Sequence, residues 1–315
     1  MSDVRSRPRA LVVATALLAL GACGTNSPEA AVGSSSIAAA SASAGIMDGM
    51  VAIDDYRKIR VTCSGLDYPG PTVILLSGSR SAGDEWMAVR KGGATGMALA
   101  DLEQSPSAVF GQVSAFARVC TYDRPGTVML SGNVSPTTKV AQPTSAAAGV
   151  ADLHAWLAAA QIAPPYVLVG HSWGGMIATL YAATYPSQTA GLVLVDPATS
   201  YLQDALTPEQ WRAFLALPAG LVDGSRKEAP DYANSVEAVR VARVGDIPVV
   251  VLTSDHPFDF GVGLDAWPDW RQAADLLASK LHANHITQTD SGHLIPIENP
   301  GVVVDAVQQV RDSSR

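Results

Sequence analysis

The chain has 315 residues, of which 48% are hydrophobic and 16% are charged. This length and composition allow one large domain or two small ones, and they exclude a wholly disordered chain. Lys and Arg total 21 against 29 Asp and Glu, a formal net charge of −8. An acidic chain lacks the basic footprint of a nucleic-acid-binding protein, and three cysteines are too few for a disulfide scaffold or a four-thiolate zinc site.

Residues 1–22 have the pattern of an export signal. Three arginines within the first nine residues precede an apolar run at 11–20, which is too short to span a bilayer as a mature helix. The run leads into Leu-Gly-Ala-Cys at 20–23, which resembles a bacterial lipobox, a motif in which the cysteine is acylated and becomes the new N-terminus. We therefore expect an exported cell-envelope lipoprotein anchored through Cys23, with an ordinary secreted protein as the alternative.

The segment after the signal has the composition of a linker. Residues 24–46 are rich in Ser, Ala and Gly and carry almost no charge, which is typical of a flexible tether. We assign the tether to residues 23–50 and a folded domain to residues 51–315.

From about residue 56, apolar strand-like runs alternate with segments of helical periodicity. The expected strands are 59–63, 72–76, 118–122, 166–169, 192–195, 249–252 and 285–289, and the expected helices are 146–163, 176–185, 269–282 and 302–310. This alternation predicts an α/β fold with a mostly parallel sheet covered on both faces. Residues 197–245 contain helical fragments and are too long for a plain crossover, so we expect them to form a cap over one edge of the sheet.

The strongest chemical signal lies at residues 170–174, which read Gly-His-Ser-Trp-Gly between a predicted strand and a predicted helix. This is the G-x-S-x-G nucleophile elbow in the context that it requires. The turn is so tight that side chains at Gly170 and Gly174 would collide with neighbouring backbone. It presents the Ser172 hydroxyl at a helix N-terminus, where the helix dipole favours developing negative charge. We predict that Ser172 is a nucleophile.

A serine hydroxyl needs a base to accept its proton, and His293 is the predicted base. Ser-Gly-His at 291–293 follows the last strand and precedes the last helix, so it opens at the same edge of the sheet as Ser172. The adjacent His171 points elsewhere in such a turn and is expected to have a packing role. The other four histidines, at 154, 256, 282 and 285, are at positions more typical of structural residues.

Two carboxylates compete to orient His293. Asp196 ends the strand 192–195, and Asp255 follows the strand 249–252; both strand ends face the edge that carries Ser172. Asp196 is favoured because it lies at the strand tip, where Pro197 stiffens the exit, but Asp255 stays open.

An acyl-transfer site also needs hydrogen-bond donors for the oxyanion. The backbone N–H of Trp173 is one candidate because it directly follows Ser172. The other is the N–H of Ser79, in the loop after the strand 72–76, where Gly78 allows a close approach of the backbone.

Taken together, these segments identify a family. The chain resembles the α/β-hydrolase superfamily over roughly residues 56–312. The matching segments are Ser77-Gly78, Tyr122-Asp123-Arg124-Pro125-Gly126, Gly170-His171-Ser172-Trp173-Gly174-Gly175, Leu194-Val195-Asp196 and Gly292-His293. Two departures concern the pocket: Ser77 stands where the family usually has His, and residues 127–131 lengthen a loop that is usually short.

The chain more narrowly resembles exported actinobacterial hydrolases that carry a cysteine in each of two early strands. An even pair of cysteines in an exported chain leaves a disulfide open on cysteine arithmetic alone. The resemblance implies that Cys63 pairs with Cys120, because the superfamily places their strands side by side. It also favours Asp196 as the acid, with Asp255 as the alternative.

The predicted activity is that of a serine hydrolase that cleaves carboxylic esters, with small amides as a second substrate class. No metal or organic cofactor is expected, and the expected partners are a small ester or amide and, through the lipid anchor only, a membrane. A non-catalytic surface binding protein of the same fold is the main alternative. An acyltransferase or perhydrolase would use the same residues. The sequence leaves the oligomeric state open.

Overall fold

The computed structural model describes residues 45–92, 94, 98–221 and 227–314. The predicted signal, Cys23 and most of the predicted tether lie outside the described residues. All of the described residues belong to one compact unit. Within them, no helix is both long enough and apolar enough to cross a bilayer.

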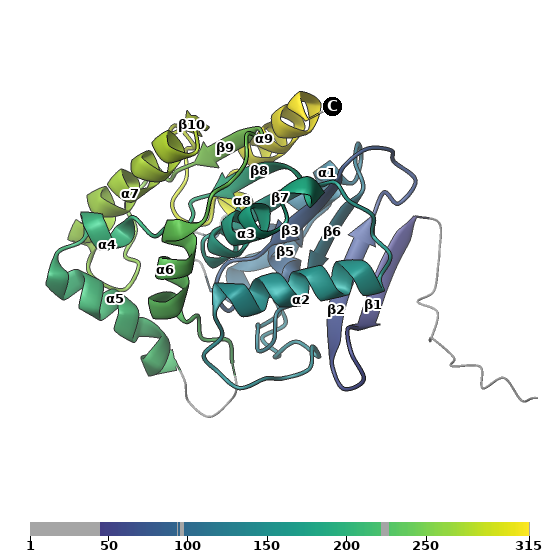
Figure 1. Cartoon of the computed structure of the whole chain (residues 1–315), viewed down its shortest axis with the longest axis horizontal. Helices are drawn as coiled ribbons and strands as arrows, with labels where there is room; N and C mark the ends of the chain where they lie inside the picture. The colour runs from purple at the N-terminus through teal and green to yellow at the C-terminus, as the bar shows by residue number, and fades with distance from the viewer. Residues whose placement is uncertain (1–44, 93, 95–97, 222–226, 315) are drawn as a thin grey trace, which may run out of the picture. The chain divides into compact units, whose positions relative to one another are not determined.

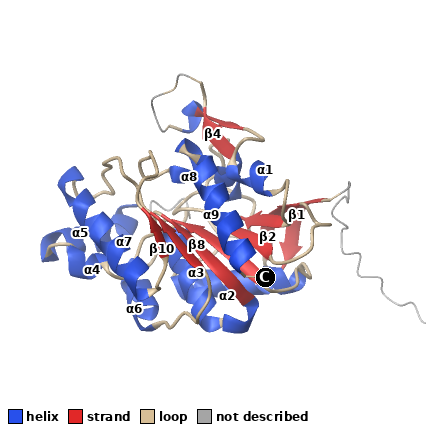
Figure 2. Ribbon diagram, turned by 90° about the horizontal axis from the view of Figure 1, so that it is seen from above, coloured by secondary structure: helices blue, strands red, loops and turns tan. Residues whose placement is uncertain are grey.

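The centre of the fold is an eight-stranded sheet with the order β1-β2-β6-β3-β7-β8-β9-β10 (Figures 1 and 2). The strands are β1 (Ile46–Ala52), β2 (Lys58–Ser64), β3 (Thr72–Leu76), β6 (Val119–Tyr122), β7 (Tyr166–His171), β8 (Thr189–Val195), β9 (Val249–Leu252) and β10 (Asn284–Ile286). β1 and β2 pair antiparallel, as do β2 and β6, whereas the pairs from β6 to β10 are parallel. The prediction of a mostly parallel sheet is confirmed.

The predicted boundary between tether and domain is wrong. Residues 46–50, which we assigned to the tether, belong to β1, and Ile46 pairs with Ser64 at the far end of β2. Successive residues of β1 alternate between exposed and half-buried positions, as expected for an edge strand with one solvated face. The folded domain therefore begins before residue 51.

Two cores cover the two faces of the sheet. Successive residues of β3 point to opposite faces: Val73 and Leu75 join one apolar cluster, and Ile74 and Leu76 join the other. The helices that complete the fold are α1 (Val109–Val113), α2 (Ala146–Ala159), α3 (Trp173–Thr184), α7 (Trp267–Lys280), α8 (Ile295–Glu298) and α9 (Pro300–Ser313). Figure 2 shows α2 and α3 on the side of the sheet opposite to α9.

The ends of several elements differ from their predicted bounds for local reasons. Helix α2 begins after Ser145, whose hydroxyl accepts a hydrogen bond from the Ala148 N–H, and it ends at Ala159, four residues before the predicted end. Strand β10 ends at Ile286 because the following residues turn to form the loop that carries His293. The short hairpin of β4 (Ala88–Arg90) and β5 (Leu102–Gln104) was not predicted.

The described residues between β8 and β9 include three helices: α4 (Leu202–Ala205), α5 (Pro208–Leu221) and α6 (Tyr232–Val241). Phe214 of α5 and Tyr232 of α6 belong to the same apolar cluster as Met176 of α3. These helices therefore pack on the α3 side of the sheet, and α5 and α6 contribute Phe214, Leu217 and Tyr232 to the lining of the cavity described below.

Cys63 and Cys120 are directly opposite each other on β2 and β6 and form a disulfide with an S–S distance of 2.07 Å. Both residues are fully buried. The bond joins β2, which belongs to the antiparallel part of the sheet, to β6, where the parallel part begins.

Candidate active site

Ser172 lies at a strained turn between β7 and α3. Its backbone has φ +49 and ψ −116, a conformation that a residue with a side chain rarely adopts. A Cβ at Gly174 would collide with the carbonyl groups of Leu76 and Ser77, and one at Gly170 would collide with the backbone of the same turn. The Ser172 N–H donates to the Val195 carbonyl of β8 at 3.0 Å. The glycines and this bond hold Ser172 at the carboxyl end of the parallel strands.

His293 is held by a carboxylate from a different loop. Its Nδ1 lies 2.6 Å from Oδ2 of Asp196, which follows β8 and is fully buried. The other oxygen of Asp196 accepts the Ser254 N–H at 2.9 Å. Because an ionised carboxylate can only accept, the contact favours the tautomer with its proton on Nδ1, in which Nε2 is the nitrogen that can accept a proton.

Aromatic rings fix the plane of the His293 imidazole. Phe258 stacks on it with ring centroids 4.6 Å apart, and Trp270 of α7 meets it edge-on at 5.4 Å. These contacts restrict rotation of the ring about the bond to Asp196. Sequence analysis missed both residues, because nothing in their local pattern marks them as neighbours of a histidine.

Ser172 and His293 line the same cavity, which has a volume of about 270 Å³. Its remaining walls are mainly aromatic or apolar, with Asp259 and Ser79 as the other polar members; the apolar members are Phe214, Leu217, Pro230, Tyr232, Phe258, Phe260 and Trp270. The Ser172 hydroxyl forms no hydrogen bond with another described residue. Catalytic hydrogen bonds are often formed only when substrate is present. The geometric support for a joint role of Ser172 and His293 is therefore that both line one cavity.

Asp255, the alternative acid, does not contact His293. Its carboxylate accepts the backbone N–H groups of Thr289, Asp290 and Ser291 at 2.9 to 3.1 Å. Desolvation would raise the pKa of Asp255, but these backbone donors outweigh it and hold the pKa below its usual value. Asp255 therefore shapes the loop that precedes His293, and the expectation that it could orient the imidazole is not met.

The loop after β3, residues 77–80, is held by three buried charged side chains. Glu85 Oε2 accepts the Gly78 N–H at 2.9 Å, and Glu228 Oε2 accepts the Arg80 N–H at 2.6 Å. Arg124 donates to the Ser77 and Gly78 carbonyls at 2.9 and 2.6 Å. The backbone of this loop, hereafter the β3 loop, is therefore fixed from several directions.

Two backbone donors remain available beside Ser172. Among the described residues, the N–H groups of Ser79 and Trp173 donate to no other protein group. Trp173 is the first residue of α3, so its N–H has no partner within the helix. Ser79 lines the cavity with Ser172. The structure therefore leaves unpaired the two N–H groups that the sequence predicted as oxyanion donors.

Arg124 and Glu228 form a buried ion pair, with Arg124 Nε 2.6 Å from Glu228 Oε1. Arg124 belongs to the Tyr-Asp-Arg-Pro-Gly segment, which sequence analysis used only as a family marker. Glu228 lies in the segment before α6 and carried no local signal. The pair neutralises two buried charges and joins the β3 loop to the chain that leads into α6.

His171 has a polar role instead of the packing role that we expected. Its Nδ1 lies 2.5 Å from Glu85 Oε1, and its Nε2 lies 2.9 Å from the His293 carbonyl oxygen. Burial alone would lower the pKa of His171, but the Glu85 carboxylate outweighs it, so the pKa lies above its usual value. Burial would conversely raise the pKa of Glu85, but the charge and hydrogen bond of His171 hold it below its usual value. The raised pKa of His171 and the lowered pKa of Glu85 both favour the charged forms, so the two side chains form an ion pair.

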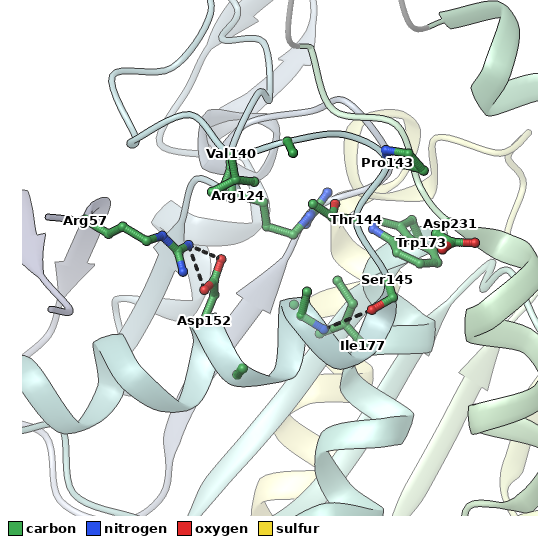
Figure 3. Close-up of a pocket in the computed structure, with 15 residues that line it drawn as sticks. Arg57, Arg124, Val140, Pro143, Thr144, Ser145, Asp152, Trp173, Ile177 and Asp231 are labelled. Carbon is green, nitrogen blue, oxygen red and sulfur yellow. Dashed lines mark hydrogen bonds and ion pairs between the residues drawn. The ribbon is translucent and has the colours of Figure 1, made fainter. Parts of the chain in front are cut away.

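A second and larger cavity, of about 470 Å³, lies beside α2 and contains neither Ser172 nor His293. Figure 3 shows its lining, with the Arg57–Asp152 ion pair on one side and the Trp173 side chain on the other. The chemistry predicted from the sequence converges on the smaller cavity, which we take as the candidate active site. In the described part of the chain, no group of three or more His, Cys, Asp and Glu side chains is placed to hold a metal ion.

Comparison with known proteins places the chain in a family. Residues 73–306 match the Alpha/beta hydrolase family, so the chain belongs to this family, as its resemblance to the superfamily predicted. An uncharacterized protein of Bacillus subtilis, YqjL, is 22% identical over 249 residues, which cover 76% of this chain and 83% of YqjL.

Two solved structures share the fold. Carboxylesterase CesB of Bacillus subtilis has a TM-score of 0.54 and 15% identity, covering 85% of this chain and 92% of CesB. Serine hydrolase CCSP0084 of Cycloclasticus has a TM-score of 0.55 and 13% identity, covering 85% and 98%. At these identities the likeness concerns the fold alone. Together with the family match, it supports a hydrolase of the α/β-hydrolase class.

Proposed function

We propose that this hydrolase cleaves carboxylic esters through a covalent acyl-enzyme on Ser172, with His293 as general base and Asp196 as its orienting acid. The observation that carries the proposal is the 2.6 Å contact between His293 and the buried Asp196, in a cavity that His293 shares with Ser172. A charged acceptor on Nδ1 leaves Nε2 free to accept a proton, which is the state that a general base requires.

In the proposed reaction, His293 Nε2 takes the hydroxyl proton as Ser172 Oγ bonds to the ester carbonyl carbon. The N–H groups of Ser79 and Trp173 donate to the oxyanion that forms. The imidazolium then returns the proton to the leaving alkoxide oxygen as the ester C–O bond breaks. Water attacks the acyl-enzyme with the same base, releases the carboxylic acid and regenerates the serine.

The cavity favours a small and mainly apolar ester. Its volume of about 270 Å³ lies just below the usual range for small-molecule sites, about 300–1,000 Å³. Aromatic side chains dominate its walls, so an acyl or alkyl group gains by leaving water, whereas a long polar chain would not. Short aliphatic and aromatic esters are therefore the proposed substrates, and small amides are the second class to test.

We further propose that the protein is exported and anchored by a lipid on Cys23. The sequence pattern at residues 1–23 is the main support for this location. The disulfide between Cys63 and Cys120 fits it, because such bonds persist in oxidising compartments. Metabolic labelling with an alkyne fatty acid would test the anchor: the proposal expects label on the wild type and none on Cys23→Ala.

The catalytic proposal is tested by hydrolysis of p-nitrophenyl butyrate. Ser172→Ala and His293→Ala should each lower kcat/KM by about 10⁴-fold or more. Ser114→Ala is a matched control, because it removes a hydroxyl just after α1 that donates only to the Gly111 carbonyl. Equal activity in the wild type and Ser172→Ala would contradict the proposal, and absence of activity in both would favour a binding protein of the same fold.

A further inference from the structure

One buried pair of titratable side chains, Glu85 and His171, lies between the β3 loop and the loop that carries His293. Glu85 belongs to a short 3-10 helix, Gly83–Met87, and His171 is the last residue of β7. Their exposed fractions are 4% and 1%. The ester mechanism proposed above gives neither residue a role, although a buried ion pair is costly to maintain unless its geometry is good.

The pair is the middle of a continuous chain of hydrogen bonds. Glu85 Oε2 accepts the Gly78 N–H at 2.9 Å, and Gly78 directly precedes the predicted oxyanion donor Ser79. Glu85 Oε1 lies 2.5 Å from His171 Nδ1, and His171 Nε2 lies 2.9 Å from the His293 carbonyl oxygen. One end of the chain thus holds the backbone of the oxyanion donor, and the other holds the backbone of the base.

The protonation state of His171 follows from its two contacts. Both ring nitrogens face oxygen acceptors, so only the doubly protonated imidazolium can donate to both. The neighbouring Trp86 ring meets the imidazole edge-on at 6.5 Å and offers no competing acceptor. The ring is therefore a rigid connector that donates in two opposite directions.

Packing shows that the connector also fixes distances. A Cβ at Gly78 would lie 2.9 Å from His171 Nδ1, so the glycine backbone lies against the imidazole with no space between them. On the other side, the His171 and His293 ring centroids are 4.8 Å apart. Asp196 holds the imidazole of His293, whereas His171 holds its main chain. Movement of either loop would break a bond of the buried pair.

From this arrangement we propose that Glu85 and His171 are positioning residues, which tie the oxyanion loop to the base loop so that Ser79 and His293 keep a fixed separation around Ser172. This inference rests on the proposed ester hydrolysis. It predicts that losing the pair impairs the chemical step, because a displacement of about 1 Å at a reacting group costs up to about 10²-fold in rate.

The test replaces both members by apolar residues of similar shape, in Glu85→Leu/His171→Phe. Removing both partners avoids an uncompensated buried charge, so the double variant should keep its fold by circular dichroism and thermal melting. With p-nitrophenyl butyrate, kcat should fall about 10- to 100-fold while KM changes less than about 3-fold. The rate of fluorophosphonate labelling should fall with kcat. A folded double variant with wild-type kcat would overturn the inference.

A second comparison decides the question if the double variant does not fold. In Glu85→Gln, the amide oxygen can accept the Gly78 N–H, and the amide nitrogen can donate to a neutral His171 that still donates to the His293 carbonyl. Glu85→Ala breaks both bonds of residue 85. The inference expects kcat to be at least about 10-fold higher in the Gln variant than in the Ala variant, and equal kcat values would overturn it.

The activity of the wild type distinguishes a failure of this inference from a failure of the proposed function. Absence of both hydrolysis and fluorophosphonate labelling in the wild type would contradict the proposed function itself. A labelled, active wild type whose folded Glu85→Leu/His171→Phe variant reacts equally fast would contradict only the positioning role.

Discussion

Oδ2 of Asp196 lies 2.6 Å from Nδ1 of His293, although 97 positions separate the two residues in the chain. The contact exists because β8 and β10 run parallel and release their following residues at the same edge of the sheet. Asp196 also has a positive φ of +40, a strained backbone state that its bonds to the β9 side of the sheet hold in place.

The Asp196–His293 contact predicts an asymmetry between two carboxylate variants. Asp196→Asn should lower kcat by about 10³- to 10⁴-fold, because the amide can donate to Nδ1 and then favours the wrong tautomer of His293. Asp255→Asn should lower kcat by less than about 10-fold, because it only loosens the loop before His293. Steady-state kinetics of the two variants side by side measure the difference. An equal loss in both would contradict the assignment of Asp196.

The nucleophile turn predicts a steric effect at Gly174. Gly174→Ala places a Cβ against the carbonyl groups of Leu76 and Ser77, so the turn must shift or the fold must lose about 1–3 kcal/mol of unfolding free energy. Gly245→Ala is the matched control, because a Cβ there meets nothing within 4 Å. The urea concentration at the unfolding midpoint and the rate of ester hydrolysis should both be lower in Gly174→Ala and unchanged in Gly245→Ala. A fully active and stable Gly174→Ala would show that the turn is less tight than described.

The charged pair predicts a pH-dependent stability difference between the wild type and Glu85→Gln. The lowered pKa of Glu85 gives stability that is present above its usual value of 4.5 and lost as pH falls through the folded-state pKa. The raised pKa of His171 gives stability that is full below its usual value of 6.5 and lost as pH rises through the folded-state pKa. The advantage of the wild type should therefore be largest between these two pH values.

Thermal melts from pH 4 to pH 9 measure this difference, and effects of the other titrating groups largely cancel in it. The charges of Asp196 and Arg124 also act on the pair, but the wild type and Glu85→Gln both retain these two residues. A difference in melting temperature that is flat across the range, or that grows above pH 7, would contradict a charged pair.

The cross-strand disulfide predicts a loss of stability when it is removed. Cys63→Ala/Cys120→Ala should lower the unfolding free energy by about 2–5 kcal/mol, mainly because the unfolded chain is no longer constrained over 57 positions. Cys23→Ala leaves the pair intact and is the control. Chemical denaturation under oxidising conditions measures the effect. Unchanged midpoints in the double variant would show that the bond adds nothing to stability.

Sequence analysis predicted the features that depend on local pattern. Strands such as β3 are continuous apolar runs bounded by Pro71 and Gly78, and the elbow at Ser172 is a five-residue motif between a strand and a helix. Both signals lie within a few residues of the feature that they specify. The fold class and the position of Ser172 could therefore be read without a structure.

The features that the sequence did not predict depend on contacts between distant residues. The choice between Asp196 and Asp255 is decided by which strand end reaches His293, and Glu85 is 86 positions from its partner His171. Strand β1 was missed for a different reason: as a half-solvated edge strand with Gly49 at its centre, it carries a weak apolar signal next to a Ser- and Ala-rich segment.

The most direct test of the central claim is to locate the covalent adduct of a fluorophosphonate by peptide mass spectrometry. The wild type should carry one adduct on Ser172. Labelling should be lost in Ser172→Ala, retained in Ser114→Ala and greatly slowed in Asp196→Asn, because the adduct forms only when the base is correctly oriented. An adduct on another residue, or equal labelling of Ser172→Ala, would contradict the assignment of this serine as the nucleophile.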